Sequence, residues 1–332
     1  MRDPNRASVY KRPMRLTHKP LTDVEWTPDL VAALADASAA IGALDARVSN
    51  SLLTVAWQNR VKLTGYAASL RLQHEPIEEV DVFSYFCGLR LPGRAIPETN
   101  SDPYAEFAEW EAMLADGKGR HWREALPFTF ELPKGWESAP QLVKALAVLD
   151  KWVKADHTKL AWLQGPLLLH QFGLTNAVLP NLVFGDAAMR NVGTDSDNLL
   201  RGLLRQASNA AEIGLARFGA MENALVRFVS VSAQERRPGK LEDLGMLLLI
   251  EPLLTPRSVA DRLGLSVAGA GKLLRRAAAH DVVIEISGRD TWRAYATRDI
   301  ALALGLADAK RGRPQNPPPP RKELQKLVGS LS

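Results

Sequence analysis

A series of helix start and stop signals near the C-terminus constrains the fold of this chain more than any other feature. Thr255 followed by Pro256 is typical of a helix start, because the threonine side chain caps free backbone amides and proline suits the first helical position. Gly264 is the residue type that ends a helix in the left-handed conformation, and Ser266 is suited to cap the next one. These signals predict three short consecutive helices, over residues 244–250, 257–263 and 267–279.

The residues after the third predicted helix are patterned as a β-hairpin. Residues 282–286 are rich in β-branched side chains, residues 287–290 predict a turn, and residues 291–295 predict the returning strand. Three short helices and a hairpin are the elements of a winged helix-turn-helix, a fold that binds DNA. We therefore expect a DNA-binding domain over residues 241–307, and we expect a fragment that begins at Lys240 to fold unaided.

The third predicted helix divides into an apolar face and a basic face. Lys272, Arg275 and Arg276 fall largely opposite the apolar residues. A recognition helix needs this arrangement, because one face docks on the domain while the N-terminal residues and the cations meet bases and phosphates. Gly269 and Gly271 each weaken the helix by about 1 kcal/mol relative to alanine, and we expect them to leave a bare surface that approaches the groove closely.

The candidate DNA-contacting residues follow from this pattern. On the second and third helices they are Arg257, Ser258, Ser266, Val267, Ala268, Gly269, Lys272, Arg275 and Arg276. On the hairpin they are Arg289, Trp292 and Arg293. The alternative for these basic residues is an ordinary solvated surface.

Both ends of the chain are basic. Residues 1–20 and 310–326 each carry six lysines or arginines against one acid, whereas the whole chain has a formal charge of only +5. Such tails commonly bind polyanions such as DNA, and solvated disorder is the alternative. In the tail of residues 308–332, Lys310, Arg311 and Arg313 belong to a Lys-Arg-Gly-Arg-Pro sequence that resembles an AT-hook, a motif of the minor groove of A/T-rich DNA.

The remainder of the chain predicts a multi-helical domain over residues 21–232, followed by a polar linker over residues 233–240. Helical periodicity is found near residues 30–44, 52–72, 77–86, 139–169 and 199–229. Residues 92–140 hold six prolines and several tryptophans, and they predict a long ordered connection pinned by aromatic side chains. The predicted fold class is therefore mainly α, with a small β-hairpin wing near the C-terminus.

The chain lacks the residues that several classes of function need. Cys87 is the only cysteine, which excludes an intrachain disulfide and a cysteine zinc cluster, and its aromatic surroundings predict a buried structural thiol. The histidines show no metal-ligand spacing. No apolar run approaches the roughly 20 residues that span a bilayer. We expect a cytoplasmic, nucleoid-associated protein that uses no metal and no cofactor and does not contact a membrane.

Several short motifs carry a resemblance to a known family. They are Leu44-Asp45-Ala46-Arg47, Gly65-Tyr66-Ala67, Asp81-Val82-Phe83-Ser84, residues 87–94, His121-Trp122-Arg123-Glu124, Ser287-Gly288-Arg289 and Trp292-Arg293-Ala294. In these motifs the chain resembles alphaproteobacterial, often plasmid-borne proteins in which a domain of unknown function (number 1612) precedes a helix-turn-helix domain. The resemblance implies DNA binding for the C-terminal part only. Ser287 stands where that family has threonine, which is a mild departure.

Helices followed by a winged helix are also similar to the layout of Fic-type nucleotidyl transferases. Those enzymes need a histidine base, an acid for magnesium and a Gly-Asn-Gly-Arg loop that holds phosphates. From His170 onward the chain keeps the spacing of His, Phe and Asn, but Leu174 replaces the acid and Val178 replaces the arginine. Thr175 and Ala177 also replace the two glycines, so we expect no such transfer.

These observations together predict a sequence-specific regulator of transcription that binds double-stranded DNA and is not an enzyme. A homodimer formed through the N-terminal domain would pair two such modules, although no coiled-coil heptad enforces it. The alternative is a Fic-like enzyme or a ligand sensor in the N-terminal domain, with DNA binding as autoregulation.

Overall fold

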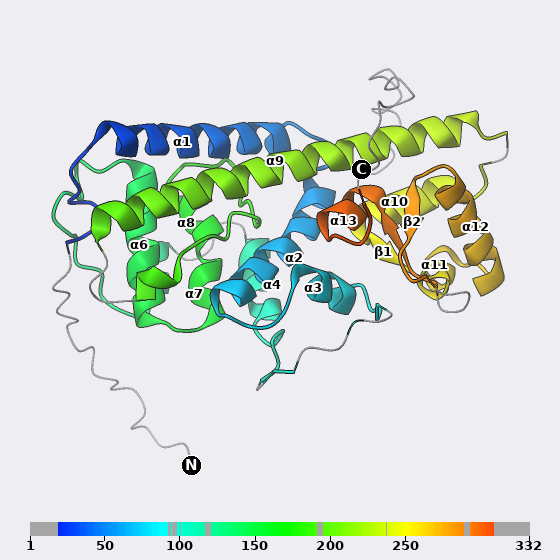
Figure 1. Ribbon diagram of the computed structural model, residues 1–332, viewed down its shortest axis with the longest axis horizontal. Coiled ribbons are helices and arrows are strands. Elements are labelled where there is room, and N and C mark those ends of the chain that lie inside the picture. The colour runs from blue at the N-terminus through cyan, green and yellow to red at the C-terminus, as the bar shows by residue number, and fades with distance from the viewer. Residues whose placement is uncertain are drawn as a thin grey trace, which may run out of the picture. The chain divides into compact units, whose positions relative to one another are not determined.

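The computed structural model describes residues 19–91, 94, 98–99, 101–116, 121–190, 195–236, 238–288 and 293–308. This part of the chain is mainly helical and contains a small antiparallel sheet, which confirms the predicted mainly α class (Figure 1). The chain divides into two compact units, one of residues 1–42 and 104–211 and the other of residues 43–103 and 212–332. None of the described helices is both long and apolar enough to cross a membrane.

The first unit is built from helices around an apolar core. Its elements are most of α1 (Pro28–Ser49), α4 (Phe107–Asp116), α5 (Trp122–Ala125), α6 (Gln141–Ala155), α7 (Lys159–Leu163), α8 (Gly165–Gln171), the 3-10 helix η1 (Ala187–Arg190) and the start of α9 (Ser196–Gln234). Helix α1 follows the predicted start signal, because the Thr27 hydroxyl accepts a hydrogen bond from the Leu30 amide at 3.3 Å. Ala37 and Ile41 of its predicted apolar stripe are fully buried.

The segment of residues 92–140 contains secondary structure that its sequence did not predict. Helices α4 and α5 lie within it, because Trp110 and Trp122 give short helical stretches a side chain to bury. The predicted aromatic pinning is present as well. The ring of Trp122 stacks on Phe172 with a centroid separation of 5.6 Å, and Phe130 meets Trp136 at 5.3 Å.

The helical pattern over residues 139–169 corresponds to three helices rather than one. Helix α6 ends at Ala155, and the Asp156 carboxylate then accepts a hydrogen bond from the Thr158 amide at 2.9 Å, which turns the chain before α7. Pro166 lies in the first turn of α8, where its missing amide costs nothing. Local side-chain hydrogen bonds therefore interrupt a periodicity that is continuous in the sequence.

The second unit joins α2 and α3 to the C-terminal part of the chain. Its elements are the end of α1, α2 (Thr54–Leu72), α3 (Glu79–Phe86), the end of α9, α10 (Leu241–Ile250), β1 (Leu253–Leu254), α11 (Pro256–Leu263), α12 (Val267–Ala279), β2 (Val283–Glu285), β3 (Tyr295–Thr297) and α13 (Arg298–Ala303). Glu78 and Asp81 form a capping box at the start of α3, and both carboxylates bind the Arg94 guanidinium, at 2.6 and 2.5 Å. Asp81 and Arg94, which belong to the motifs behind the family resemblance, thus hold α3 in place.

The sheet has the strand order β1-β3-β2, and both pairings are antiparallel. Tyr295 of β3 pairs with Leu254 on one side and with Glu285 on the other. The third strand, β1, was not predicted. Strand β3 begins at Tyr295, so residues 293 and 294 of the expected returning strand lie outside it, and residues 289–292 are not among the described residues.

The expected linker over residues 233–240 does not divide two separately packed bodies. Helix α9 continues to Gln234, and its Phe228 belongs to the apolar core formed by α10, α11 and α12. A Cβ atom on Gly245 of α10 would lie 2.1 Å from Cε1 of Phe228, so the glycine allows the ring to lie directly on the helix backbone. The region of residues 241–307 shares its core with α9, which argues against its unaided folding.

Candidate nucleic-acid interface

Helix α11 begins with a capping box that uses one of the candidate residues. The Thr255 hydroxyl accepts a hydrogen bond from the Ser258 amide at 3.1 Å, and the Ser258 hydroxyl accepts one from the Thr255 amide at 2.9 Å. The side chain of Ser258 is therefore engaged in holding the helix start. Arg257, in the same turn, is exposed.

The turn between α11 and α12 places the start of α12 at the surface. Gly264 ends α11 at a φ of 64°, a left-handed conformation that glycine adopts without strain. The Ser266 hydroxyl then accepts a hydrogen bond from the Gly269 amide at 3.1 Å, which caps α12 as predicted. Val267 is 55% exposed and Ala268 is exposed beside it, so the first turn of α12 presents small apolar side chains to solvent.

Helix α12 has the two faces that its sequence predicts. The buried residues are Ala270, Leu273, Leu274 and Ala277. The exposed stripe, which we call the α12 stripe, consists of Ala268, Lys272, Arg275 and Ala279. Ala279 was not singled out from the sequence, because a small residue gives no chemical signal of its own.

The basic residues of the second unit include two groups. Lys240, Arg262 and Arg298 each pair with a carboxylate of the same unit, at 2.8, 2.5 and 3.5 Å. Within the described residues, no carboxylate pairs with Lys272, Arg275 or Arg257. Positive charge on α12 and at the start of α11 is therefore left without a carboxylate partner in the described part of the chain, as a surface for a polyanion requires.

Arg276 differs from its neighbours on α12. It is half-buried, its guanidinium donates a hydrogen bond to the Pro238 carbonyl, and its Nε lies 3.8 Å from the Glu235 carboxylate. These contacts tie α12 to the end of α9 and the segment that follows it. Arg276 thus has protein partners that Lys272 and Arg275 lack.

The two glycines of α12 lie in different surroundings. Gly269 is half-exposed near the cap, and a Cβ there would lie 3.2 Å from the Ser266 hydroxyl. Gly271 is buried, and a Cβ there would lie 3.9 Å from Cβ of Pro256. The expectation that both glycines leave a bare outer surface is therefore wrong for Gly271. This residue precedes the exposed Lys272 by one position, which turns it toward α11.

Only some of the candidate DNA-contacting residues of the hairpin and the tail are among the described residues. Glu285 accepts hydrogen bonds from the Ser287 hydroxyl, at 2.5 Å, and from the Gly288 amide, at 3.1 Å, which shapes the start of the turn. Arg293 is half-buried and interacts within the protein. The candidates that lie outside the described residues are Arg289, Trp292, Lys310, Arg311 and Arg313.

No family model matches this chain, and no curated protein matches it. The family resemblance therefore depends on the motifs quoted above.

The structure also describes the surroundings of two other candidate residues, His170 and Cys87. Nδ1 of His170 lies 3.0 Å from the Thr175 carbonyl oxygen, so the ring closes the turn after α8. Burial raises the pKa of the Cys87 thiol from 9.0 to about 11, which keeps it protonated at neutral pH and makes it a poor nucleophile. The thiol is half-buried rather than fully buried.

Proposed function

We propose that this chain is a sequence-specific DNA-binding protein that regulates transcription. In this proposal α10, α11, α12 and the sheet form a winged helix-turn-helix, and α12 is the recognition helix. The observation that carries the proposal is the α12 stripe, where Lys272 and Arg275 have no carboxylate partner among the described residues and stand between two alanines. Small neighbours allow the helix to approach a groove closely, and the free cations then reach phosphates or guanine edges.

The first turn of α12 supplies the other part of the interface. Val267 and Ala268 are exposed at the end of the helix that enters the major groove in this class of domain, and their methyl groups suit contact with thymine methyls. Arg257 at the start of α11 is placed on the same module to bind the phosphate backbone. Ser258 and Ser266 act by capping the two helices, and Arg276 by holding α12 against the segment after α9.

The hairpin, the C-terminal tail and a second copy of the chain would contribute to DNA binding outside the α12 stripe. Lys310, Arg311 and Arg313 would bind the minor groove beside the operator, and Arg289 and Trp292 would contact DNA from the hairpin. A homodimer on the bacterial nucleoid would pair two modules on two half-sites. We also propose that the chain belongs to the alphaproteobacterial family whose motifs it resembles.

The test compares two charge-matched double variants of the full chain. Lys272→Ala with Arg275→Ala removes two unpaired cations, whereas Lys240→Ala with Arg262→Ala removes two cations that already have acidic partners. Affinity for labelled duplex DNA is measured by fluorescence anisotropy across a series of salt concentrations. We expect the first variant to lose at least about tenfold in affinity and to flatten the slope of log affinity against log salt by about 1.8, and the second to change little.

The specificity of binding is tested by selection from a random duplex library. An enriched motif that the Lys272 and Arg275 variant no longer selects would support the proposal. Equal losses in the two double variants, or no DNA binding by the folded full chain, would contradict it.

A further inference from the structure

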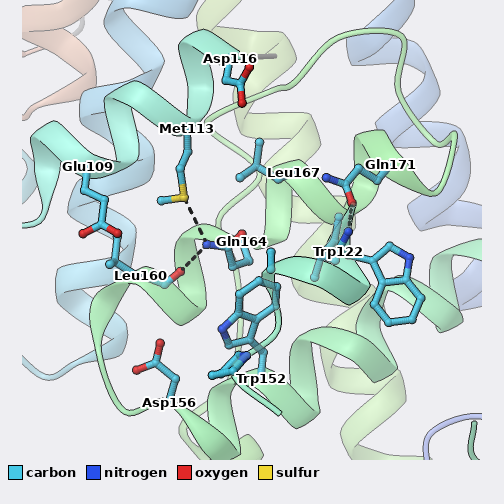
Figure 2. A pocket seen from close by; sticks show the side chains of 13 residues that line it. Glu109, Met113, Asp116, Trp122, Trp152, Asp156, Leu160, Gln164, Leu167 and Gln171 are labelled. Atoms are coloured by element: carbon cyan, nitrogen blue, oxygen red, sulfur yellow. Dashed lines mark hydrogen bonds between the residues drawn. The ribbon is translucent and has the colours of Figure 1, made fainter. Parts of the chain in front are cut away.

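The first unit contains a cavity that the proposed DNA-binding function does not use. Its volume is about 450 Å³, within the range of small-molecule sites. The lining residues come from α4 to α8 and their connections, and Figure 2 shows the side chains that face it. Trp122, Trp152 and Leu167 give the cavity apolar walls.

The walls of the cavity are held in place by contacts with neighbouring side chains. The Trp122 amide donates a hydrogen bond to Oε1 of Gln171 at 2.8 Å, and the Trp122 ring stacks on Phe172. Trp152 is buried in α6. The site is therefore formed before any ligand binds, which reduces the ordering cost of binding.

Gln164 provides a polar group at the cavity wall. This side chain lines the cavity and is only 8% exposed. Its Nε2 lies 3.3 Å from the Leu160 carbonyl oxygen and 3.6 Å from Sδ of Met113, as the dashed lines in Figure 2 mark. Its Oε1 has no hydrogen-bond partner among the described residues and is not one of the fully buried oxygens, so it is an acceptor that a donor in the cavity can reach.

The charge of the cavity identifies the kind of donor. The lining includes three carboxylates, of Glu109, Asp116 and Asp156, and no lysine, arginine or histidine among the described residues. In Figure 2, Glu109 and Asp156 lie to one side of Gln164 and Trp122 lies to the other. No group of three metal-ligating side chains converges within the described part of the chain, so these carboxylates do not form a metal site there.

We propose that this cavity binds a primary ammonium ion carried on a flat apolar body, such as an arylalkylamine. The ammonium N–H donates to Oε1 of Gln164 within the field of Glu109 and Asp156, and the apolar body lies against Trp122 and Trp152. The carboxylates favour an organic cation and disfavour an anion of the same shape. This site is independent of the proposed DNA-binding surface.

Calorimetric titration of the full chain tests the charge preference. The probes are phenethylammonium, the neutral phenethyl alcohol and the anion phenylpropanoate, which have similar apolar bodies. We expect saturable binding of phenethylammonium at least about tenfold tighter than of the other two. Equal or tighter binding of the anion, or no saturable binding of the ammonium up to about 10 mM, would overturn the proposal.

Variants then separate the roles of the lining residues. Glu109→Gln with Asp156→Asn should weaken phenethylammonium about tenfold, whereas Glu111→Gln with Glu137→Gln, which removes two exposed charges of the same unit outside the cavity, should not. Gln164→Met should weaken phenethylammonium about fivefold and leave phenethyltrimethylammonium unchanged, because the quaternary ion has no N–H to donate.

An occluding variant locates the site. Ala125 is exposed at the cavity wall, so Ala125→Trp should block the binding of phenethylammonium without lowering the thermal unfolding midpoint. Undiminished binding in this variant, or equal effects of the two charge-removing pairs, would show that the amine binds elsewhere and would overturn the assignment.

Discussion

Arg60 of α2 and Asp299 of α13 form an ion pair of 2.6 Å, with side chains that are only 4% and 6% exposed. The same guanidinium donates to the Leu249 carbonyl through Nε, at 2.9 Å, and to the Leu248 carbonyl through Nη2, at 2.6 Å. These carbonyls belong to the last turn of α10, where the helix leaves acceptors unsatisfied and carries partial negative charge. One buried arginine therefore joins three helices of the second unit.

We expect Arg60→Met to lower the free energy of unfolding by about 3–5 kcal/mol, because it leaves the Asp299 carboxylate buried without a partner. Asp299→Leu alone should also be costly, whereas the double variant should recover part of the loss. A double-mutant cycle of urea midpoints measures this coupling. Additive losses would show that the two charges do not depend on each other.

Gly245→Ala should destabilise the protein by about 1–3 kcal/mol even though alanine is the better helix former, because the new methyl group would overlap the Phe228 ring. Gly271→Ala on α12 is the matched control, since its Cβ would meet atoms only at 3.9 Å. The control should be neutral or stabilising by up to about 1 kcal/mol. Thermal unfolding followed by circular dichroism compares them, and an equal response of both variants would contradict the packing described for Phe228.

A fragment that begins at Lys240 should be much less stable than the same region in the full chain. It lacks Phe228, which closes the apolar core, and Arg60, which binds the end of α10. Amide hydrogen exchange of residues 241–279 in the fragment and in the full chain measures the difference. Equal protection in the two would restore the expectation of unaided folding.

Arg275→Ala and Arg276→Ala should have different effects although the residues are adjacent. Arg275→Ala removes an exposed cation of the α12 stripe, so DNA affinity should fall while the unfolding midpoint stays constant. Arg276→Ala removes a hydrogen bond to the Pro238 carbonyl and should lower stability by up to about 1 kcal/mol. Anisotropy and thermal unfolding of both variants separate the two roles, and identical profiles would contradict this division.

The thiol of Cys87 should make stability fall as the solution becomes alkaline. Its pKa is 9.0 when exposed and about 11 in the folded protein, where burial disfavours the thiolate. Between these two pH values the unfolded chain has lost the thiol proton and the folded chain has kept it. The contribution of the thiol to the free energy of unfolding, on the order of 2 kcal/mol, is therefore complete below about pH 9 and is lost by about pH 11. Denaturant midpoints of the wild type and of Cys87→Ala at both pH values measure it, and the difference between the two proteins should change with pH.

The sequence by itself determined the elements whose ends depend on local chemistry. Helix α12 spans Val267–Ala279 as predicted, because Ser266 caps its first amides within three residues. The end of α11 at Gly264 was likewise predictable, since a left-handed residue suits glycine without reference to the rest of the fold. The apolar face of α12 followed from the helical period alone.

Only the tertiary structure decided the relationships between distant segments. The sequence placed the boundary at residues 233–240, but Phe228 packs into the core beyond it because Gly245 leaves room for its ring. Nothing near Arg60 in the sequence indicates Asp299 or the carbonyls of α10, and nothing near Gln164 indicates that its side chain lies at the wall of a cavity. Capping and periodicity act within a few residues along the chain, whereas burial and charge pairing depend on which segments meet in space.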